Sequence, residues 1–327
     1  MTSFMVRKRL LIYGDVEMDI LLKTESAEAG AYDVKVDDIR FSPGGSAANC
    51  AAIAGSLGQP VTFLGSLGSD TWIKPLLQDF RKFNVNTRYL KKAAGKTGTC
   101  VAVVNAAGER KFHSYRGVNE SDPPDLPPQT LWRHHHCLHL SGYCFQQPNS
   151  RRIAWSLLHE AKRNGLAVSL DPSYFFAKQS GSEMDELLAA LDFIFPNLDE
   201  ALILSGENDP VKAARVLRAR GVNTVLVTLG SDGCLLSTNE TEQFVKIKPV
   251  NKVVDTTGAG DAFCGGFLTG WLKGLPLIQA CKLGCASAAH IVTQMGAHEQ
   301  APTLTNLIDI LHNNNEGELV IQLKNLS

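Results

Sequence analysis

Residues 255–263, DTTGAGDAF, place two carboxylates around two glycines directly before an apolar run. Glycine inside a helix costs up to about 1 kcal/mol relative to alanine, so Gly258 and Gly260 need a reason other than helix stability. The N-terminus of a helix offers unpaired backbone N–H groups and a partial positive charge, and glycine lets an anion approach them closely. The segment therefore predicts a phosphate site at Gly258, Ala259 and Gly260, with Asp261 projecting from the first helical turn.

A purely structural interpretation of the same segment is a capped helix with an acidic first turn, which is a common arrangement. It accounts for Thr256 or Thr257 as the cap and for Asp261, but it does not account for the Gly-Ala-Gly sequence. The spacing therefore favours the phosphate site.

A second glycine cluster occurs in SPGGSAANCA, residues 42–51. Gly44 and Gly45 precede a predicted helix of small residues and leave room for a ligand to lie against the backbone. Asn49, one turn into that helix, offers both a hydrogen-bond donor and an acceptor. A turn followed by a closely packed helix explains the segment equally well, so the cluster alone leaves both interpretations open.

Short apolar runs alternate with helical patterns along most of the chain, which is typical of parallel β-α-β units. The predicted strands are 9–16, 61–68, 137–142, 167–171, 193–197 and 224–230. The predicted helices are 45–58, 71–84, 152–163, one from 258, 277–293 and 305–312. Residues 20–41 and 97–117, the latter with a hairpin pattern, predict a small β lid. We therefore expect residues 1–327 to form a single α/β domain with this lid.

Composition limits the classes of partner. The formal net charge is -1 with no long charged block, which argues against nucleic acid or an anionic membrane as the main partner. The early run LLIY is too short for the core of a signal peptide, and no run of 18 apolar residues occurs. Eight cysteines without a C-x-x-C pair, mostly within apolar runs, predict reduced, buried thiols and a cytoplasmic location.

Four histidines in WRHHHCLH, residues 132–139, could suggest a metal site. Adjacent residues on a strand point to opposite faces, so three in a row cannot converge on one ion without distortion. We therefore expect no metal at His134, His135, His136 and His139.

GGSAAN at 44–49 together with DTTGAGDAF at 255–263 resembles the ribokinase-like, or PfkB-type, carbohydrate kinases over nearly the full chain. GDVEMD at 14–19, PNLDE at 196–200 and VTLG at 227–230 agree in order and spacing. The resemblance implies a three-layer α/β/α core with a mostly parallel sheet and a small β lid. It also implies ATP- and Mg²⁺-dependent phosphorylation of a hydroxyl group of a sugar.

The resemblance implies a role for each matching residue. The sugar would be held by Asp19, Gly44, Gly45 and Asn49. The nucleotide would contact Asn197, Thr228, Gly230, Gly258 and Gly260, with Glu200 near magnesium, directly or through water. The anion hole would be Gly258, Ala259 and Gly260, and Asp261 would be the catalytic base. This fits phosphoryl transfer, because positioning and charge stabilisation do most of that catalysis. Asp261 need only orient the hydroxyl and accept its proton, and an ordinary aspartate is ionised near neutral pH.

In the ribokinase branch, an aspartate at the position of Asp255 helps to hold a monovalent cation. A K⁺ ion would offset this carboxylate beside the phosphates, with backbone carbonyls around residues 291–296 as its other ligands. The alternative is that Asp255 accepts hydrogen bonds from the backbone of the threonines that follow it.

Departures from the family pattern bear on the substrate. Ribokinases carry asparagine where Glu17 stands, which counts against ribose. Ser173 and Phe175 replace the Asn and Arg of fructokinase- and ketodeoxygluconate kinase-type relatives. Lys111 and Arg116 are either contacts for an acidic sugar or sugar phosphate, or solvated edge charges.

Other functions remain as alternatives to a sugar kinase. They are a nucleoside kinase of the same fold and an inactive sensor that binds sugar or nucleotide. The retained Asp261, glycines and Glu200 argue against the sensor. A nucleotide-dependent oxidoreductase is disfavoured, because the first strand runs into GDVEMD rather than G-x-G-x-x-G. As a candidate assembly, we consider a homodimer that forms through the β lid.

Overall fold

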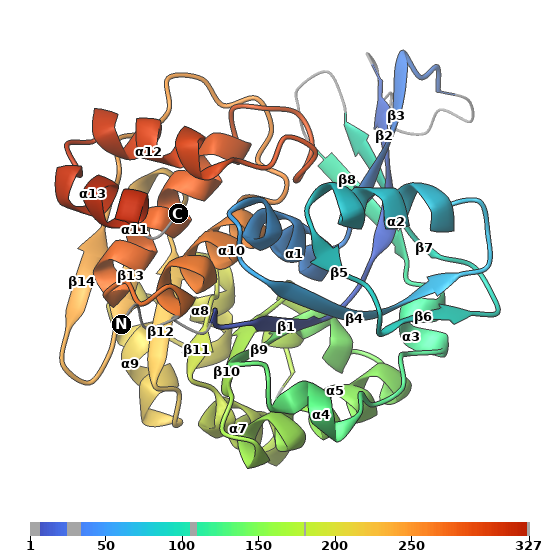
Figure 1. The fold of residues 1–327 in the computed structure, drawn as a ribbon, viewed down its shortest axis with the longest axis horizontal. Coiled ribbons are helices and arrows are strands. Elements are labelled where there is room, and N and C mark those ends of the chain that lie inside the picture. Colours follow the sequence, from blue (N-terminus) through green and yellow to red (C-terminus); the bar gives the residue numbers. More distant parts are fainter. Residues whose placement is uncertain (1–6, 25–33, 105–109, 180, 326–327) are drawn as a thin grey trace, which may run out of the picture.

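The computed structural model of the chain describes residues 7–24, 34–104, 110–179 and 181–325. Its centre is a ten-stranded sheet with the order β14-β13-β12-β11-β10-β9-β1-β4-β5, in which β6 also pairs with β4 (Figure 1). Every pairing is parallel except those of β13 with its two neighbours. The strands are β1 Leu10–Tyr13, β4 Val61–Gly68, β5 Val85–Asn86, β6 Leu90–Ala93, β9 Cys137–Ser141, β10 Ala167–Asp171, β11 Phe193–Ile194, β12 Thr224–Thr228, β13 Cys234–Ser237 and β14 Glu242–Val245.

Helices cover both faces of this sheet, which gives the expected three layers (Figure 1). Successive residues of β1 point to opposite faces of the sheet, so they join different sheet–helix interfaces. Leu10 and Ile12 belong to one buried apolar cluster, and Leu11 and Tyr13 belong to the other. The first interface is formed with α1 Ser46–Ser56, α2 Ile73–Lys82, α10 Ala259–Leu272 and α11 Leu277–Ile291. The second is formed with α4 Gln129–Trp132, α5 Pro148–Arg163, α7 Ser182–Ala190, α8 Leu198–Ser205 and α9 Pro210–Ala219.

Two helices near the C-terminus, α12 Leu304–Asn313 and α13 Gly317–Asn325, pack outside the first helical layer. Leu307, Leu311 and Leu323 are fully buried there, in a third apolar cluster. The remaining short helical turns are α3 Val118–Ser121, α6 Tyr174–Ala177, η1 Gly142–Phe145 and η2 Gly230–Asp232.

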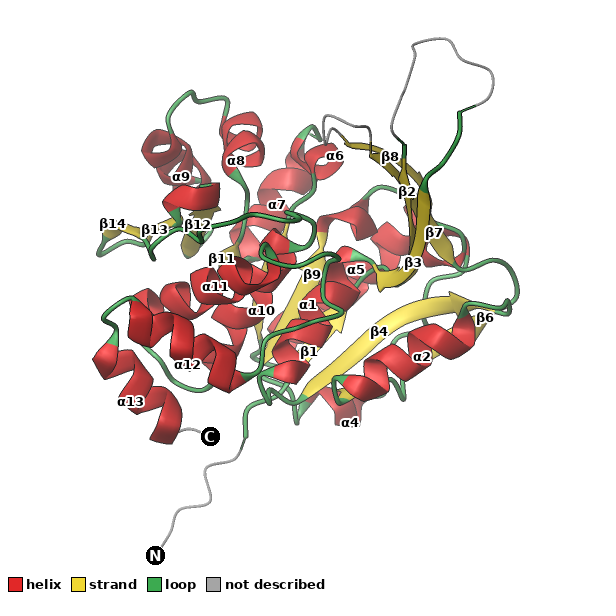
Figure 2. Cartoon of the chain, turned by 90° about the horizontal axis from the view of Figure 1, so that it is seen from above, coloured by secondary structure: helices red, strands yellow, loops and turns green. Residues whose placement is uncertain are grey.

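A separate four-stranded sheet forms the lid, with the order β3-β2-β7-β8 (Figure 2). Its strands are β2 Glu17–Lys23, β3 Asp38–Gly44, β7 Gly98–Val104 and β8 Arg110–Tyr115. The sheet includes more residues than the predicted segments, since β2 starts at Glu17 and β3 ends at Gly44. Two parts of those segments, 25–33 and 105–109, lie outside the described residues.

The boundaries of several elements differ from prediction. Helix α10 starts at Ala259, and its N-cap is Gly258 in the left-handed region, with φ 74°, rather than a threonine. The first predicted strand, 9–16, ends at Tyr13 before a short turn. Helix α13 was not predicted.

The histidine-rich segment 132–139 is not a single strand, because only His139 of its four histidines lies on β9. His135 contacts the Leu131 carbonyl and the Thr62 hydroxyl, and buried His139 contacts the Ser169 hydroxyl. These contacts occupy both ring nitrogens of His135 and Nδ1 of His139.

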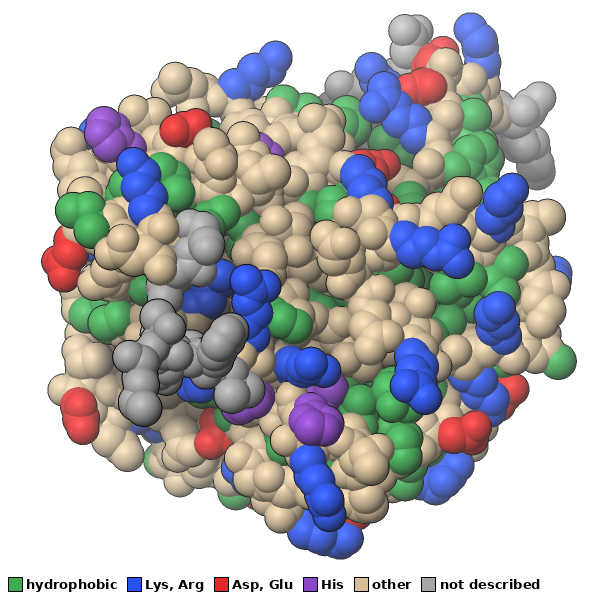
Figure 3. All heavy atoms as spheres, viewed as in Figure 1, with side chains coloured by type: hydrophobic (Ala, Val, Ile, Leu, Met, Phe, Trp, Pro, Cys, Tyr) green, Lys and Arg blue, Asp and Glu red, His purple; other side chains and the backbone are tan. Residues whose placement is uncertain are grey.

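The eight cysteines are all free, and every one except Cys100 is buried. Among the helices of the described residues, none combines the length and apolar character that a membrane span requires. On the face drawn in Figure 3, hydrophobic side chains form patches that polar and charged surface separates.

Candidate active site

The predicted site residues meet where parallel strands end and helices begin, which is where open α/β sheets bind ligands. Asp171 and Thr228 are the last residues of β10 and β12. Asn197 pairs with Thr228 through an isolated parallel bridge, which places it beside the end of β12. Helix α10 starts at the same edge, so Asp261 lies among these strand ends.

The two glycines of the α10 start have different structural roles. Gly258 has a positive φ, and a Cβ atom there would lie 2.7 to 2.8 Å from atoms of Ala297. The backbone and its packing therefore require glycine at 258. A Cβ atom on Gly260 would meet no atom within 4 Å, so this position opens onto free space. Gly260 thus leaves its backbone accessible to a ligand.

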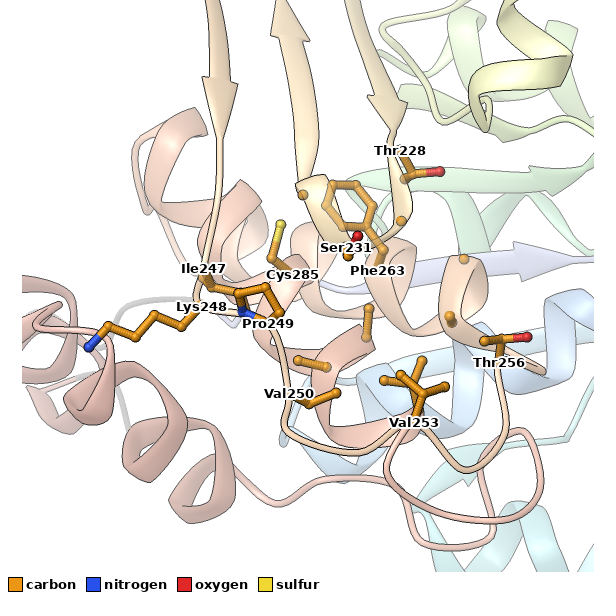
Figure 4. Close-up of a pocket in the computed structure, with 17 residues that line it drawn as sticks. Thr228, Ser231, Ile247, Lys248, Pro249, Val250, Val253, Thr256, Phe263 and Cys285 are labelled. Atoms are coloured by element: carbon orange, nitrogen blue, oxygen red, sulfur yellow. The ribbon is translucent and has the colours of Figure 1, made fainter.

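An apolar cavity of about 350 Å³ lies on one side of this helix start (Figure 4). Ala259 and Gly260 line it together with Thr228 and Gly230. The other walls are mainly aliphatic and aromatic side chains, among them Ile247, Val250, Val253, Phe263 and Val292. An apolar slot that reaches a helix N-terminus suits a ligand with a flat apolar ring at one end and phosphates at the other.

A second cavity of about 290 Å³ lies between the lid and residues 255–257 and 295–300. Its lid wall includes Asp19, Arg40 and Phe112, and its core wall includes Asp255 and Glu299. The two cavities share the α10 start, because Thr256 lines the first and Thr257 lines the second. The predicted phosphate site therefore stands between two separate binding spaces.

The lid side of the second cavity explains the glycine cluster at 44–45. A Cβ atom on Gly44 would lie 2.1 Å from Oδ2 of Asp19, so glycine allows this carboxylate to rest on the β3 backbone. Gly45 has φ 100°, and a Cβ atom there would lie 2.5 Å from the Asp15 carbonyl oxygen. Gly45 therefore requires glycine on structural grounds, whereas Gly44 leaves the space that the Asp19 carboxylate occupies.

Asp261 accepts a hydrogen bond of 2.7 Å at Oδ2 from the side-chain amide of Asn49. This contact joins the first turns of α10 and α1. Burial raises the pKa of Asp261, and hydrogen bonds from Asn49 and Ser46 oppose that rise. The sequence-based expectation of an ordinary aspartate pKa therefore needs correction, since burial among the surrounding protein groups disfavours the charged form.

Several other carboxyl groups near Asp261 share this shift. Burial raises the pKa of Asp19 and of Glu200 to about 7 in each case, and the Asp261 charge adds to both shifts. Burial also raises the pKa of Glu17 and Asp171 well above the ordinary range. Such a cluster is relieved by a bound cation, which stabilises the ionised forms.

Glu200 and Asn197 form a capping box at the start of α8. The Glu200 carboxylate accepts from the Asn197 backbone N–H at 3.0 Å, and the Asn197 side chain accepts from the Glu200 N–H at 2.9 Å. The hydrogen bond from the Asn197 backbone N–H is made to Oε2 of Glu200. A carboxylate oxygen beside Asp171 and Asp261 suits Mg²⁺, which prefers oxygen ligands and retains waters.

Asp255 is buried and joins two loops. Its Oδ1 accepts from the Thr257 N–H at 2.8 Å, and its Oδ2 accepts from the Gly296 N–H at 3.1 Å. The contact with Thr257 is the backbone hydrogen bond that we considered as the alternative to a cation site. The contact with Gly296 brings residues 291–296, the predicted source of carbonyl ligands, beside Asp255. Both carboxylate oxygens of Asp255 therefore accept hydrogen bonds from backbone N–H groups, and a monovalent cation beside it stays a prediction.

Arg116 does not point into the second cavity as a free cation. It is buried and donates two hydrogen bonds of 2.7 Å to the carboxylate of Asp15. This excludes the solvated-edge interpretation, because the guanidinium is held in an ion pair at the base of the lid. Its sugar contact stays a prediction. Lys111 is exposed on β8.

Sequence reasoning missed several polar residues of the site, among them Ser46, Asp79, Asp171 and His298. Ser46 donates to Asp171 at 3.2 Å, and His298 lies next to Asn49. Asp171 ends a predicted strand, a position that could have drawn attention to it. Asp79 and His298 stand outside any local motif.

A glycine-rich helix start between an apolar slot and a polar, lid-covered cavity defines a phosphotransferase that acts on a hydroxyl acceptor. The chain belongs to the pfkB family of carbohydrate kinases, whose family model matches residues 7–304.

Individual relatives support this assignment. An uncharacterized sugar kinase of Archaeoglobus fulgidus is 34% identical over 75% of this chain and 96% of its own length. The ribokinase of Haemophilus influenzae is 29% identical, covering 94% and 99% of the two chains. The Arabidopsis thaliana ribokinase complexed with ribose and ATP is 25% identical with a TM-score of 0.80, covering 93% and 98%.

Acceptors differ among the relatives. The cytidine kinase of Thermococcus kodakarensis is 28% identical over 88% of this chain and 97% of its own length. Family membership therefore establishes a sugar or nucleoside kinase without fixing its substrate.

Proposed function

We propose that the chain transfers the γ-phosphoryl group of ATP to a hydroxyl group of a sugar or sugar derivative. The observation that carries this proposal is the position of the α10 start between the two cavities. A γ-phosphoryl group at Gly260 would have the rest of the ATP molecule on one side and the acceptor on the other. That arrangement suits the in-line geometry of phosphoryl transfer.

In this proposal, Asp261 is the general base and the backbone of 258–260 is the anion hole. Asp261 would orient the acceptor hydroxyl and take its proton, while the helix N-terminus offsets charge on the moving group. Thr228 and Gly230 line the nucleotide cavity, and Asn197 stands beside them. Mg²⁺ would neutralise phosphate charge at Glu200, directly or through water.

Asp19, supported by Gly44, would grip hydroxyl groups of the acceptor, since a carboxylate can accept two hydrogen bonds. Glu17 lies beside Asp19 and Cys100, with their ligand atoms within 4.8 Å of one another. The extra carboxyl group at 17 disfavours ribose as the acceptor. A nucleoside remains the second candidate, because a cytidine kinase is among the relatives and Phe112 lines the cavity.

A panel of acceptors tests the proposal. Purified protein, ATP and Mg²⁺ are combined with pentoses, hexoses, keto acids, sugar phosphates and nucleosides, and ADP release is measured. We expect one acceptor class to raise the rate above the acceptor-free rate, and Asp261→Asn to abolish that increase. ADP release that no acceptor stimulates would contradict the proposal and would favour a sensor.

We also propose a homodimer that forms through the lid. Strand alternation puts Asp19, Leu21 and Phe112 on the cavity face, and therefore puts apolar residues on the other face. Those residues are Ile20, Leu22, Ile39, Phe41, Val101, Val103 and Tyr115. Phe41 contacts the Trp72 ring, yet Ile39, Phe41 and Tyr115 are each more than half exposed, so much of this face is left uncovered by the described chain. Light scattering should give the mass of a dimer, and Phe41→Glu should give a monomer.

A further inference from the structure

A chain of three short hydrogen bonds leads away from Asp261 into the protein. Asn49 Nδ2 donates to Asp261 at 2.7 Å, and Asn49 Oδ1 lies 2.6 Å from Nδ1 of His298. Nε2 of His298 in turn lies 2.7 Å from the Asp79 carboxylate. The four residues come from α10, α1, the loop after α11, and α2, so only the folded chain assembles them.

The middle of this chain is shielded from water. Asn49 is 5% exposed and His298 is 1% exposed, with the His298 ring packed edge-on against Phe83. Hydrogen-bond partners of such groups are difficult to replace, because water cannot substitute for a lost partner. The geometry of the network is therefore set by the protein.

The chemistry of the partners determines which group donates in each bond. The Asp79 carboxylate only accepts, so Nε2 of His298 carries a proton and donates to it. The Asn49 carbonyl oxygen, which faces Nδ1 of His298, also only accepts, so this contact is a hydrogen bond when Nδ1 carries a proton as well, in the imidazolium form beside Asp79. With its oxygen fixed in this way, the Asn49 amide must direct its NH₂ group at Asp261. A flipped amide would place its oxygen against the Asp261 carboxylate and its NH₂ group against the His298 N–H.

We propose that His298 is a positioning residue for Asp261, acting through Asn49, and that Asp79 holds His298 in place. The Asn49 hydrogen bond fixes Oδ2 of Asp261 and thereby the direction in which the carboxylate meets the acceptor hydroxyl. Productive proton transfer requires that hydrogen-bond geometry. This inference rests on the proposed role of Asp261 as general base.

Two substitutions of one residue separate positioning from packing. His298→Leu removes the donor to Asn49, whereas His298→Asn places an amide NH₂ near the position of Nδ1 and keeps it. We expect His298→Leu to lower kcat by about tenfold or more, because a hydrogen-bonded base is misplaced. The KM values for acceptor and ATP should change less than about twofold. His298→Asn should recover most of the lost kcat, and the matched control His159→Leu, on an exposed face of α5, should behave as wild type.

A double-substitution cycle tests the route through Asn49. Once Asn49→Ala has removed the link, adding His298→Leu should not lower kcat further. Additive effects of the two substitutions on kcat would overturn the proposal. A normal kcat in His298→Leu would also overturn it. So would a kcat in His298→Asn that is as low as in His298→Leu. If His298→Leu does not fold, His298→Asn compared with wild type and with Asn49→Ala still decides the outcome.

Failure of the wider proposal has a different signature. If Asp261→Asn retains full turnover, the general base is misassigned and the network has no catalytic end. If Asp261→Asn is inactive and His298→Leu is normal, only the positioning role of His298 is wrong.

Discussion

Alanine at Gly258 and alanine at Gly260 should have opposite consequences, although the two residues are only two positions apart. At 258 the backbone is left-handed, with φ 74°, and the new Cβ atom would meet Ala297 at 2.7 to 2.8 Å. At 260 the new Cβ atom would have no neighbour within 4 Å. Gly258→Ala should therefore damage the fold, and Gly260→Ala should damage the reaction.

The size of each effect follows from these surroundings. A left-handed conformation costs a non-glycine residue about 1–2 kcal/mol, and a forced contact in a packed region adds about 1–3 kcal/mol. Gly258→Ala should thus lower the free energy of unfolding by about 2–5 kcal/mol. Gly260→Ala should leave stability equal or raise it by at most about 1 kcal/mol, because alanine is the better helix former.

The methyl group of Gly260→Ala would stand where a phosphoryl oxygen approaches the helix N-terminus. Losing one hydrogen bond to a charged group costs about 1.5–3 kcal/mol, which corresponds to a roughly 10- to 150-fold fall in kcat/KM for ATP.

Urea unfolding followed by circular dichroism measures the first effect, and steady-state kinetics with varied ATP measures the second. Wild-type kcat/KM in Gly260→Ala would show that no phosphoryl group approaches this face of the helix. Unchanged stability in Gly258→Ala would refute the packing argument for that glycine.

Four further outcomes are expected. Asp261→Asn should keep the fold and lower turnover by about 100-fold or more, the loss expected for a positioned base; near-normal turnover on the true acceptor would refute the assignment. Asp19→Ala should raise the KM for the acceptor steeply and leave ATP affinity unchanged, and the reverse pattern would mean that the two cavities are assigned the wrong way round. Adding K⁺ to buffer free of Na⁺ and K⁺, at constant ionic strength, should raise activity through Asp255; equal rates with a bulky organic cation would rule that site out. Burial lowers the pKa of His139 to about 3. Because the folded pKa lies below the unfolded value near 6.5, the stability linked to His139 is complete above pH 6.5 and is lost toward pH 3. The free energy of unfolding should fall by up to about 1.4 kcal/mol per pH unit there, and His139→Gln should flatten the slope in urea titrations.

The sequence predicted those parts of the site that local chemistry encodes. Gly258, Gly260 and Asp261 lie within one helical turn, so their spacing alone indicates an anion site with an acid beside it. The alternation of apolar runs and helical patterns likewise predicted the parallel sheet, since each β-α-β unit is locally determined.

Contacts between distant segments were beyond the reach of sequence patterns. Nothing local to Asp79 or His298 shows that they meet near Asn49, because tertiary packing of three elements brings them together. The partner of Arg116 could not be predicted for the same reason. Its place after a hairpin does not indicate an ion pair with Asp15, which lies 101 positions earlier in the chain. The raised pKa of Asp261 also depends on burial that the sequence does not show.

The connection of the lid to the core has a consequence for the competition between acceptor and water. Asp19 lies on lid strand β2, whereas Asp261 lies on core helix α10, and the buried Asp15–Arg116 pair fastens the lid strands where they leave the core. If Asp19 grips the acceptor and Asp261 takes its proton, as proposed, a swing of the lid about that pair would change the distance between these two groups. An acceptor that bridges the two carboxylates would then draw the lid inward, whereas a water molecule would be too small to do so. The size of the acceptor would in that case suppress wasteful hydrolysis of ATP, without any device that recognises water itself.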